Sequence, residues 1–310
     1  MKHIVSVSLG SSTRDHQVRM ELLGEEYLIE RIGMDGDMTK MRETIRRLDG
    51  KADAIGLGGI TGLFPVGGKT YTLRSARPLM NTTRYTPLVD GTGWKRVLER
   101  QVILDLDREG IVPVRGKKAL LTVAFDRYSM AQAFAELDCA LSCGDLVFSF
   151  GLPVLIRGFN TFHRVIRTLA PAVCLLPFAW LYPTGKREEQ VEDAQRFARY
   201  YHEADIIAGD YLYIQRFMPD DLTGKIIITN TVTPQNVADL KARGVKTLVT
   251  TTPNLGGRSF GSNLIQAVTV AYLGKKPETI TDEEYMMVTR ELGFKPRIEH
   301  LNGFAEERPD

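Results

Sequence analysis

The sequence predicts an α/β protein, with a doubly wound parallel sheet in its larger carboxy-terminal part and a smaller mixed α/β domain before it. Two observations lead to this prediction. After Gly116, short apolar runs with the length of strands covered on both faces alternate with helical patterns. Before Gly116, hairpin patterns and glycine pairs interrupt any such alternation. Strands connected through helices form right-handed crossovers, which give the parallel sheet of a Rossmann-like domain.

For the amino-terminal part, the sequence predicts short strands and helices in a mixed order. The first strand alternates apolar residues with serines, a hairpin is indicated on either side of Gly24, and an amphipathic helix is stopped by Asp49 and Gly50. In order, we expect strands at 4–9, 17–23, 26–32, 52–55, 69–73 and 87–90, and helices at 38–48, near 75–81 and at 94–108. Residues 1–116 are therefore the expected amino-terminal, substrate-side domain.

For the carboxy-terminal part, the sequence predicts six strands with helices between them. The strands are expected at 119–124, 138–143, 173–176, 205–208, 225–229 and 246–250. The helices are expected at 129–137, 159–169, 188–202, 211–217, 234–243 and 263–273. Residues 117–274 are therefore the predicted nucleotide-binding domain. Residues 275–310 are expected to form a helix at 282–292, capped by Thr281, and a tail.

The composition indicates a globular protein and excludes several classes of partner. Hydrophobic residues make up 43% and charged residues 25% of the 310 positions, which argues against disorder. Lys and Arg (40) nearly balance Asp and Glu (38), so we expect no cationic surface for nucleic acid. No apolar run suits a membrane span, the start is too polar for a signal peptide, and the 3 cysteines indicate a reducing compartment. We expect a cytoplasmic protein with a small-molecule substrate and neither nucleic-acid nor membrane partners; a homodimer stays open.

The first two strands of 117–274 are followed by residues that suit a dinucleotide. Ligands of open parallel sheets bind at the carboxyl ends of the strands. Asp126, Arg127 and Ser129 open a helix there, whose N–H groups can receive a phosphate, although the G-x-G-x-x-G pattern is absent. Asp145 follows the next strand, where NAD-binding folds place an acid on the adenosine ribose, and a carboxylate there favours NAD over NADP. A plain helix cap and a turn former are the alternative roles.

Small and polar residues also follow the later strands. Gly209 lets the backbone approach a planar ring, and Asn230 and Thr231 can hold a carboxamide or a substrate hydroxyl. Thr252, after the last strand, is a further candidate for cofactor binding. For the glycine-rich stretch at 250–261, which holds Thr252, Arg258 and Ser259, an ordinary tight connection is the alternative.

Candidate substrate residues lie in two regions. Arg258 and Ser259, in a glycine-rich stretch, can offer a guanidinium and hydrogen-bond donors to an anionic group. Ser11, Gly58 and Asp90 lie at glycine-bearing strand ends of the amino-terminal part. We expect substrate to bind on that side. The histidines show no metal-ligand spacing, so no metal site is predicted.

Tyr182 and Lys186 are the candidates for proton transfer. They lie in a segment with prolines at 171, 177 and 183, which indicates a shaped loop. A lysine beside a tyrosine lowers the pKa of the phenol, and the pair can then relay a proton. The alternative role for these aromatic residues is packing in the core or under a lid.

A resemblance to a known family rests on five motifs, at 126–131, 144–148, 181–185, 229–231 and 257–261. On these motifs the chain resembles bacterial proteins labelled quinate/shikimate 5-dehydrogenase-like, over nearly its whole length. The resemblance implies an NAD(P)-binding Rossmann protein. The shikimate dehydrogenase family proper has a lysine–aspartate pair in its first domain and a glycine-rich dinucleotide turn in its second. Neither is found in that place in this sequence, so the resemblance does not extend to activity on quinate or shikimate.

These observations together predict an NAD(P)-dependent oxidoreductase that acts on a small polar or anionic alcohol or amine, with Arg127 and Arg258 as anion clamps. The alternatives are an S-adenosylmethionine-dependent transferase, which uses the same kind of sheet, and a non-catalytic protein that binds a nucleotide or other ligand. A sugar- or acid-kinase-like protein is disfavoured, because the first strand has serines where that class needs an aspartate for Mg²⁺.

Overall fold

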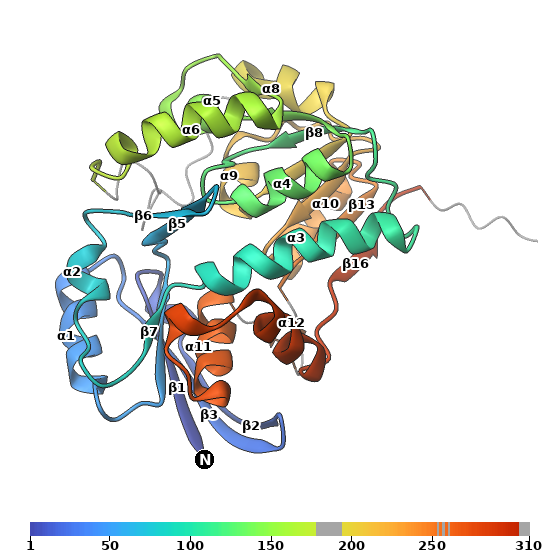
Figure 1. Ribbon diagram of the computed structural model, residues 1–310. Helices are drawn as coiled ribbons and strands as arrows, with labels where there is room; N and C mark the ends of the chain where they lie inside the picture. The colour runs from blue at the N-terminus through green and yellow to red at the C-terminus, as the bar shows by residue number, and fades with distance from the viewer. Residues whose placement is uncertain (178–193, 253, 256–257, 260, 304–310) are drawn as a thin grey trace, which may run out of the picture. The chain divides into compact units, whose positions relative to one another are not determined.

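The computed structural model describes residues 1–177, 194–252, 254–255, 258–259 and 261–303. The chain divides into two compact units, each built from separate stretches of sequence (Figure 1). Unit 1 comprises Met1–Leu98, Val165–Glu188 and Phe260–Phe294, and unit 2 comprises Glu99–Arg164, Glu189–Ser259 and Lys295–Asp310. The expected boundaries after residues 116 and 274 therefore differ from the observed division, because the chain returns to unit 1 after forming most of unit 2.

Unit 1 contains a five-stranded sheet in the order β2-β3-β1-β4-β7. The central strand β1 (Lys2–Ser8) pairs in parallel with β3 (Glu25–Gly33) and with β4 (Ala54–Gly58). At one edge β2 (His16–Leu22) is antiparallel to β3, and at the other β7 (Leu88–Val89) is parallel to β4. The hairpin and the alternating first strand were expected from the sequence, and both are present.

The remaining elements of unit 1 surround this sheet. They are η1 (Ser12–Arg14), α1 (Met38–Leu48), the hairpin β5 (Leu63–Val66) and β6 (Lys69–Thr72), α2 (Arg77–Met80), α11 (Ser262–Leu273), η3 (Pro277–Thr279) and α12 (Asp282–Glu291). Side chains fix two of the helix starts: Asp37 caps α1, and Thr281 forms a capping box with Glu284 at α12. The helix α3 (Thr92–Arg108) begins in unit 1 and ends in unit 2.

The helix α11 packs against β1 and β4, so it completes the core of unit 1. The amide of Asn263 donates a hydrogen bond of 2.7 Å to the Ser6 hydroxyl on β1. A side chain at Gly56 on β4 would bring a Cβ within 2.8 Å of the Asn263 carbonyl oxygen, so glycine is needed for this close packing. The sequence placed this helix in the nucleotide-binding domain; its packing assigns it to the other unit.

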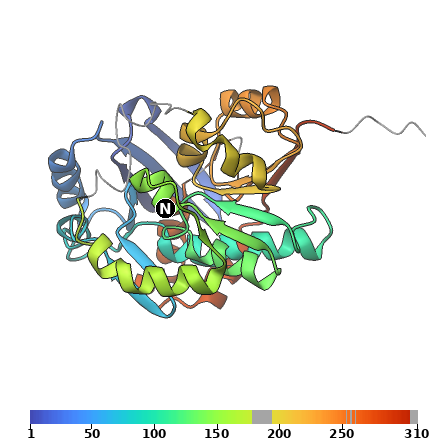
Figure 2. The same cartoon turned by 90° about the horizontal axis from the view of Figure 1, so that it is seen from above.

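Unit 2 contains a seven-stranded sheet in the order β10-β9-β8-β11-β12-β13-β16. Five neighbouring strands are parallel: β8 (Lys118–Leu121), β9 (Ala140–Cys143), β11 (Ile206–Gly209), β12 (Ile226–Thr229) and β13 (Thr247–Thr250). The edge strands β10 (Ile156–Arg157) and β16 (Arg297–His300) are antiparallel to β9 and β13. In Figure 2 the paired strands β8 and β9 lie side by side in green. The predicted class, an α/β fold with a Rossmann-like parallel sheet, is confirmed.

The connections of unit 2 are helices, as the alternating pattern predicts. They are α4 (Tyr128–Glu136), α5 (Asp145–Phe150), α6 (Phe159–Val173), α8 (Ala194–Glu203), α9 (Tyr211–Phe217) and α10 (Pro234–Ala242), and the last residues of α6 belong to unit 1. A short antiparallel pair, β14 (Asn254–Leu255) and β15 (Arg258–Ser259), follows the last parallel strand.

One predicted strand, at 173–176, is wrong. Val173 is the last residue of α6, and the N–H of Cys174 donates to the carbonyl of Ala170 at 2.9 Å, which is a helical bond. A short apolar run cannot be told from a buried helix segment by its periodicity. The sequence also missed α5 and the strands β5, β10 and β16.

In the part of the chain that the structure describes, no helix combines the length and apolar character needed to cross a bilayer. Within the same residues, no group of three or more His, Cys, Asp or Glu side chains is arranged to hold a metal ion.

Candidate functional site

The strand order of unit 2 reverses between β8 and β11, which is where open α/β sheets bind their ligands. From β8 the chain continues outward to β9 on one side, and it later returns to place β11 on the other. The residues that follow these strands therefore line the expected site. They include most of the cofactor-binding residues that the sequence predicts.

Arg127 is the centre of a buried charge cluster at this edge. Its side chain is only 3% exposed and forms ion pairs with Glu99, with Asp210 at 3.0 Å and with Asp126 at 3.7 Å. Asn230 extends the cluster, because its amide nitrogen donates to Asp210 at 2.8 Å. Three carboxylates thus face one guanidinium. The sequence predicted Arg127 as an anion clamp, but the carboxylates already engage its charge.

Asp145 holds the loop that follows β8. Its Oδ1 accepts a hydrogen bond from the N–H of Phe125 at 2.8 Å, and its Oδ2 accepts one from Ala124 at 3.1 Å. Burial raises the pKa of this carboxyl from 3.8 to about 6, although the two N–H bonds act in the opposite direction. The sequence predicts a ribose contact for Asp145. In the structure its carboxylate holds the loop after the neighbouring strand β8 in place.

Gly209, the last residue of β11, lies against Thr122 after β8. The φ angle of Gly209 is +133°, and a Cβ there would lie 2.2 Å from the Thr122 hydroxyl oxygen. The missing side chain therefore admits Thr122 rather than leaving an open face for a planar ring. The carbonyl of Gly209 accepts a hydrogen bond from the Thr229 hydroxyl at 2.8 Å, which ties β11 to β12.

The other predicted cofactor residues lie close to the same strand ends. The hydroxyls of Thr231 and Thr252 are 2.8 Å apart, after β12 and β13 respectively. Ser129 is buried in the first turn of α4. The side chain of Arg127, the N-cap residue of α4, makes no capping hydrogen bond.

A tyrosine–histidine pair in unit 2 was not predicted. The hydroxyl of Tyr128 lies 2.5 Å from Nδ1 of His163, and the Phe159 ring contacts both rings, with centroids 5.6 and 5.9 Å away. The two residues lie on α4 and α6, far apart in sequence. No spacing rule brings them together, so the sequence offers no signal for this pair.

The structure does not test the roles of two groups of predicted residues. Tyr182 and Lys186, the proposed proton-transfer pair, lie outside the described residues. For Arg258 and Ser259 the structure gives the backbone alone, as the strand β15. Their assigned roles therefore remain predictions.

The predicted substrate residues of unit 1 have local structural roles. Ser11 accepts a hydrogen bond from the N–H of Thr13 at 3.2 Å and so caps η1. Gly58 lies against Ser8 on the neighbouring strand, where a Cβ would approach within 2.7 Å of the Ser8 Cβ. Asp90 is different, because it also lines a pocket.

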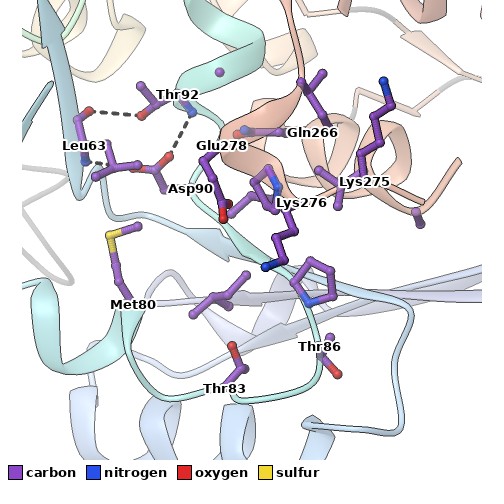
Figure 3. A pocket seen from close by; sticks show the side chains of 18 of the residues that line it. Leu63, Met80, Thr83, Thr86, Asp90, Thr92, Gln266, Lys275, Lys276 and Glu278 are labelled. Carbon is purple, nitrogen blue, oxygen red and sulfur yellow. Dashed lines mark hydrogen bonds between the residues drawn. The ribbon is translucent and has the colours of Figure 1, made fainter. Parts of the chain in front are cut away.

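This pocket is contained in unit 1, has a volume of about 990 Å³, and is lined in part by Leu88 and Val89 of the edge strand β7. Figure 3 shows it from close by. Asp90 lies at one end, where its buried carboxylate accepts hydrogen bonds from Gly62 at 2.8 Å, Leu63 at 2.9 Å and Thr92 at 3.0 Å. Three N–H donors to one carboxylate fix the loop after β4 to the start of α3.

Gln266 of α11 lines the pocket and is 5% exposed. Its amide nitrogen donates to the Tyr285 hydroxyl at 2.9 Å, but its amide oxygen has no hydrogen-bond partner within the described structure. Gly93 makes room for this pair, because a Cβ there would lie 2.6 Å from both Gln266 Nε2 and Tyr285 Oη. The sequence did not single out Gln266, since an amide on an apolar helix usually has a core partner.

Comparison with known families decides where the chain belongs. A model of the family described as "Domain of unknown function (DUF8754)" matches residues 93–301, about two thirds of the sequence. The chain belongs to this family. A second model, "Domain of unknown function (DUF8753)", matches residues 3–90. The DUF8754 segment thus includes α11 and α12, which pack in unit 1, as well as the whole parallel sheet of unit 2. A search of curated proteins finds no match.

Several solved structures are distantly similar. Hetero-hexameric glutamate dehydrogenase from Thermus thermophilus is 13% identical, with 94% of this chain and 74% of that chain covered and a TM-score of 0.41. GanP, a glucose-galactose binding protein from Geobacillus stearothermophilus, is 9% identical, with 97% of each chain covered and a TM-score of 0.39. L-tryptophan dehydrogenase from Nostoc punctiforme is 12% identical, with 94% and 79% covered and a TM-score of 0.38.

Proposed function

We propose that the protein is an NAD(P)-dependent oxidoreductase that acts on a small polar or anionic alcohol or amine. The observation that supports this most is the reversal of strand order between β8 and β11, with polar side chains gathered after both strands. This is the position at which doubly wound sheets hold dinucleotides. The resemblance to quinate/shikimate 5-dehydrogenase-like proteins points to the same class.

The residues at this edge fit a dinucleotide in part. The amino end of α4, which the Arg127 side chain does not cap, can offer N–H groups to a pyrophosphate. Thr231 and Thr252 can hold a carboxamide, and Asp145 next to the loop after β8 would disfavour the extra phosphate of NADP. When bound, the cofactor would supply or accept the hydride. Tyr182 with Lys186 remains the proposed pair that holds the proton.

One observation favours a second candidate, an S-adenosylmethionine-dependent transferase. Glu99, Asp126 and Asp210 all lie within ion-pair distance of the Arg127 guanidinium, so several carboxylates gather at the strand ends. Carboxylates attract a cationic ligand and repel a pyrophosphate. The sulfonium of S-adenosylmethionine is such a cation.

Titration of the full chain with NADH and NADPH, followed by cofactor fluorescence, tests the proposal. We expect saturable binding, tighter for NADH, and a smaller preference for NADH in Asp145→Asn. The matched control is Asp220→Asn, an acid in unit 2 that is 98% exposed, which should leave both affinities unchanged. Absence of binding at millimolar NADH and NADPH overturns the oxidoreductase. Stabilisation against heat by S-adenosylmethionine alone would then support the transferase. Cofactor binding without turnover over a panel of alcohols and amines identifies a non-catalytic binding protein.

A further inference from the structure

The pocket of unit 1 has the features of a ligand site that is separate from the strand ends of unit 2. Its apolar wall includes Leu63, Met80, Val89 and Ile280. Its polar groups come from the start of α3, from α11 to α12, and from the segment before β7, which contributes Arg84. In Figure 3, Gln266, Lys276 and Glu278 extend from the α11–α12 side, while Leu63, Met80 and Asp90 lie opposite. Both sides are formed by residues of unit 1, so the site does not depend on unit 2.

The strongest sign of a ligand is the unpartnered oxygen of Gln266. A buried carbonyl without a donor is costly, and native structures rarely leave one unsatisfied. In the structure the Gln266 nitrogen donates to the Tyr285 hydroxyl, which leaves the amide oxygen without a partner among the described residues. The oxygen therefore calls for a donor from a molecule in the pocket.

The charged groups around the pocket indicate what that donor is. Two of the lining cations already have partners, because Arg96 pairs with Asp282 and Lys275 pairs with Glu284. Asp90 is satisfied by its three N–H donors. By contrast, the exposed side chains of Arg84, Lys276 and Glu278 form no ion pair or hydrogen bond with any described residue. Among these described side chains, the pocket therefore offers the carboxylate of Glu278 and the cations of Lys276 and Arg84 to a ligand.

We propose that this pocket binds a small amino carboxylate. Its ammonium donates to the Gln266 oxygen and pairs with Glu278, and its carboxylate pairs with Lys276. An ammonium suits the site better than a hydroxyl, because a carboxylate lies on the same side of the pocket as the unpartnered oxygen. The apolar wall then packs against the carbon chain that joins the two charged groups.

Isothermal titration calorimetry of the full chain tests this proposal with a series of probes: glycine, β-alanine, 4-aminobutanoate and L-glutamate. We expect at least one to bind with a millimolar or lower Kd, and 4-hydroxybutanoate and butylamine, which each lack one charged group, to bind at least about tenfold more weakly. Glu278→Gln, at an exposed position, should weaken the binding of the tightest probe by about tenfold, and Gln266→Met should do the same. Glu43→Gln on α1 is the matched control and should leave the Kd unchanged.

Three results overturn the proposal. They are no binding of any amino carboxylate at about 20 mM, unchanged affinity in Glu278→Gln, and equal affinity for the hydroxy and the amino probe. Gln266→Met is interpreted beside Glu278→Gln, because a buried change can disturb packing whereas the exposed one does not. Since these titrations contain no cofactor, their outcome is independent of whether unit 2 binds NADH.

Discussion

The carboxylate of Asp145 accepts a hydrogen bond of 2.8 Å from the backbone N–H of Phe125. With the second bond, from Ala124, it joins the start of α5 to the loop after β8. A carboxylate that the sequence marks for ligand binding thus also determines the shape of the strand end. The structural role can be tested by itself, because it affects stability in the absence of any ligand.

Asp145→Asn should change how stability depends on pH. Burial raises the pKa of Asp145 from 3.8 to about 6, so its favourable contribution to the free energy of unfolding is complete below 3.8 and is lost as the pH rises through about 6. The full contribution is about 3 kcal/mol. Asparagine does not titrate, so the advantage of the wild type over the variant should shrink between about pH 4 and about pH 7. Urea denaturation across this range measures it, and a constant or growing advantage contradicts the assignment.

Gly209→Ala should destabilise unit 2 by about 3 kcal/mol, because a Cβ meets the Thr122 hydroxyl and the backbone angle disfavours any side chain. Thr122→Ala removes the atom that collides. The double variant should therefore regain about half of the loss, with the cost of the backbone angle remaining. Denaturant unfolding of the four proteins in this cycle gives the coupling. Simple additivity of the two changes would rule out the contact.

Arg127→Met should cost about 3–5 kcal/mol, because three carboxylates lose the cation that they share in a buried place. Adding Glu99→Gln should restore part of this loss, since one of the unpaired charges is removed. The control is Arg115→Met, whose 58% exposed side chain pairs with Asp107 and Asp138 and should cost less than about 1 kcal/mol. Equal losses of stability in Arg127→Met and Arg115→Met would show that burial does not strengthen the ion pairs of Arg127.

Tyr285→Phe should destabilise unit 1 by about 1–3 kcal/mol, because the nitrogen of Gln266 loses its acceptor and both polar atoms of that amide are then unpaired. Combining it with Gln266→Met removes the polar group itself and should recover stability. Tyr85→Phe, at a tyrosine that is 80% exposed, serves as the control. Thermal unfolding provides the measurement, and a neutral Tyr285→Phe would mean that water satisfies the amide.

The sequence was most informative where local chemistry determines the structure. The helices at 38–48 and 211–217 have the predicted bounds, because Asp37 and Asp210 cap their starts. It failed at 173–176, where the apolar residues belong to a helix end, and at β16, whose alternating polar residues form a strand only by pairing with β13. Such pairing is a long-range property that no local pattern encodes.

The same distinction holds for the candidate site. Residues after parallel strands could be placed from the strand pattern alone, and the predicted Asp126, Arg127 and Asn230 do lie in one cluster. The partners of Arg127 could not be predicted, because Glu99 comes from α3 and Asp210 from a strand end far along the chain. The Gln266 oxygen also escaped prediction, because its lack of a partner appears only when α11 is packed beside α12.

The return of α11 to β1 and β4 has a consequence for how the protein is made. The ribosome releases the first sheet long before Ser262–Leu273, so its apolar face stays uncovered while the whole parallel sheet of unit 2 emerges. A truncated product ending near residue 116 would keep that face in water and would be a substrate for chaperones or proteases. Maturation of the amino-terminal sheet thus waits until α11 has been synthesised.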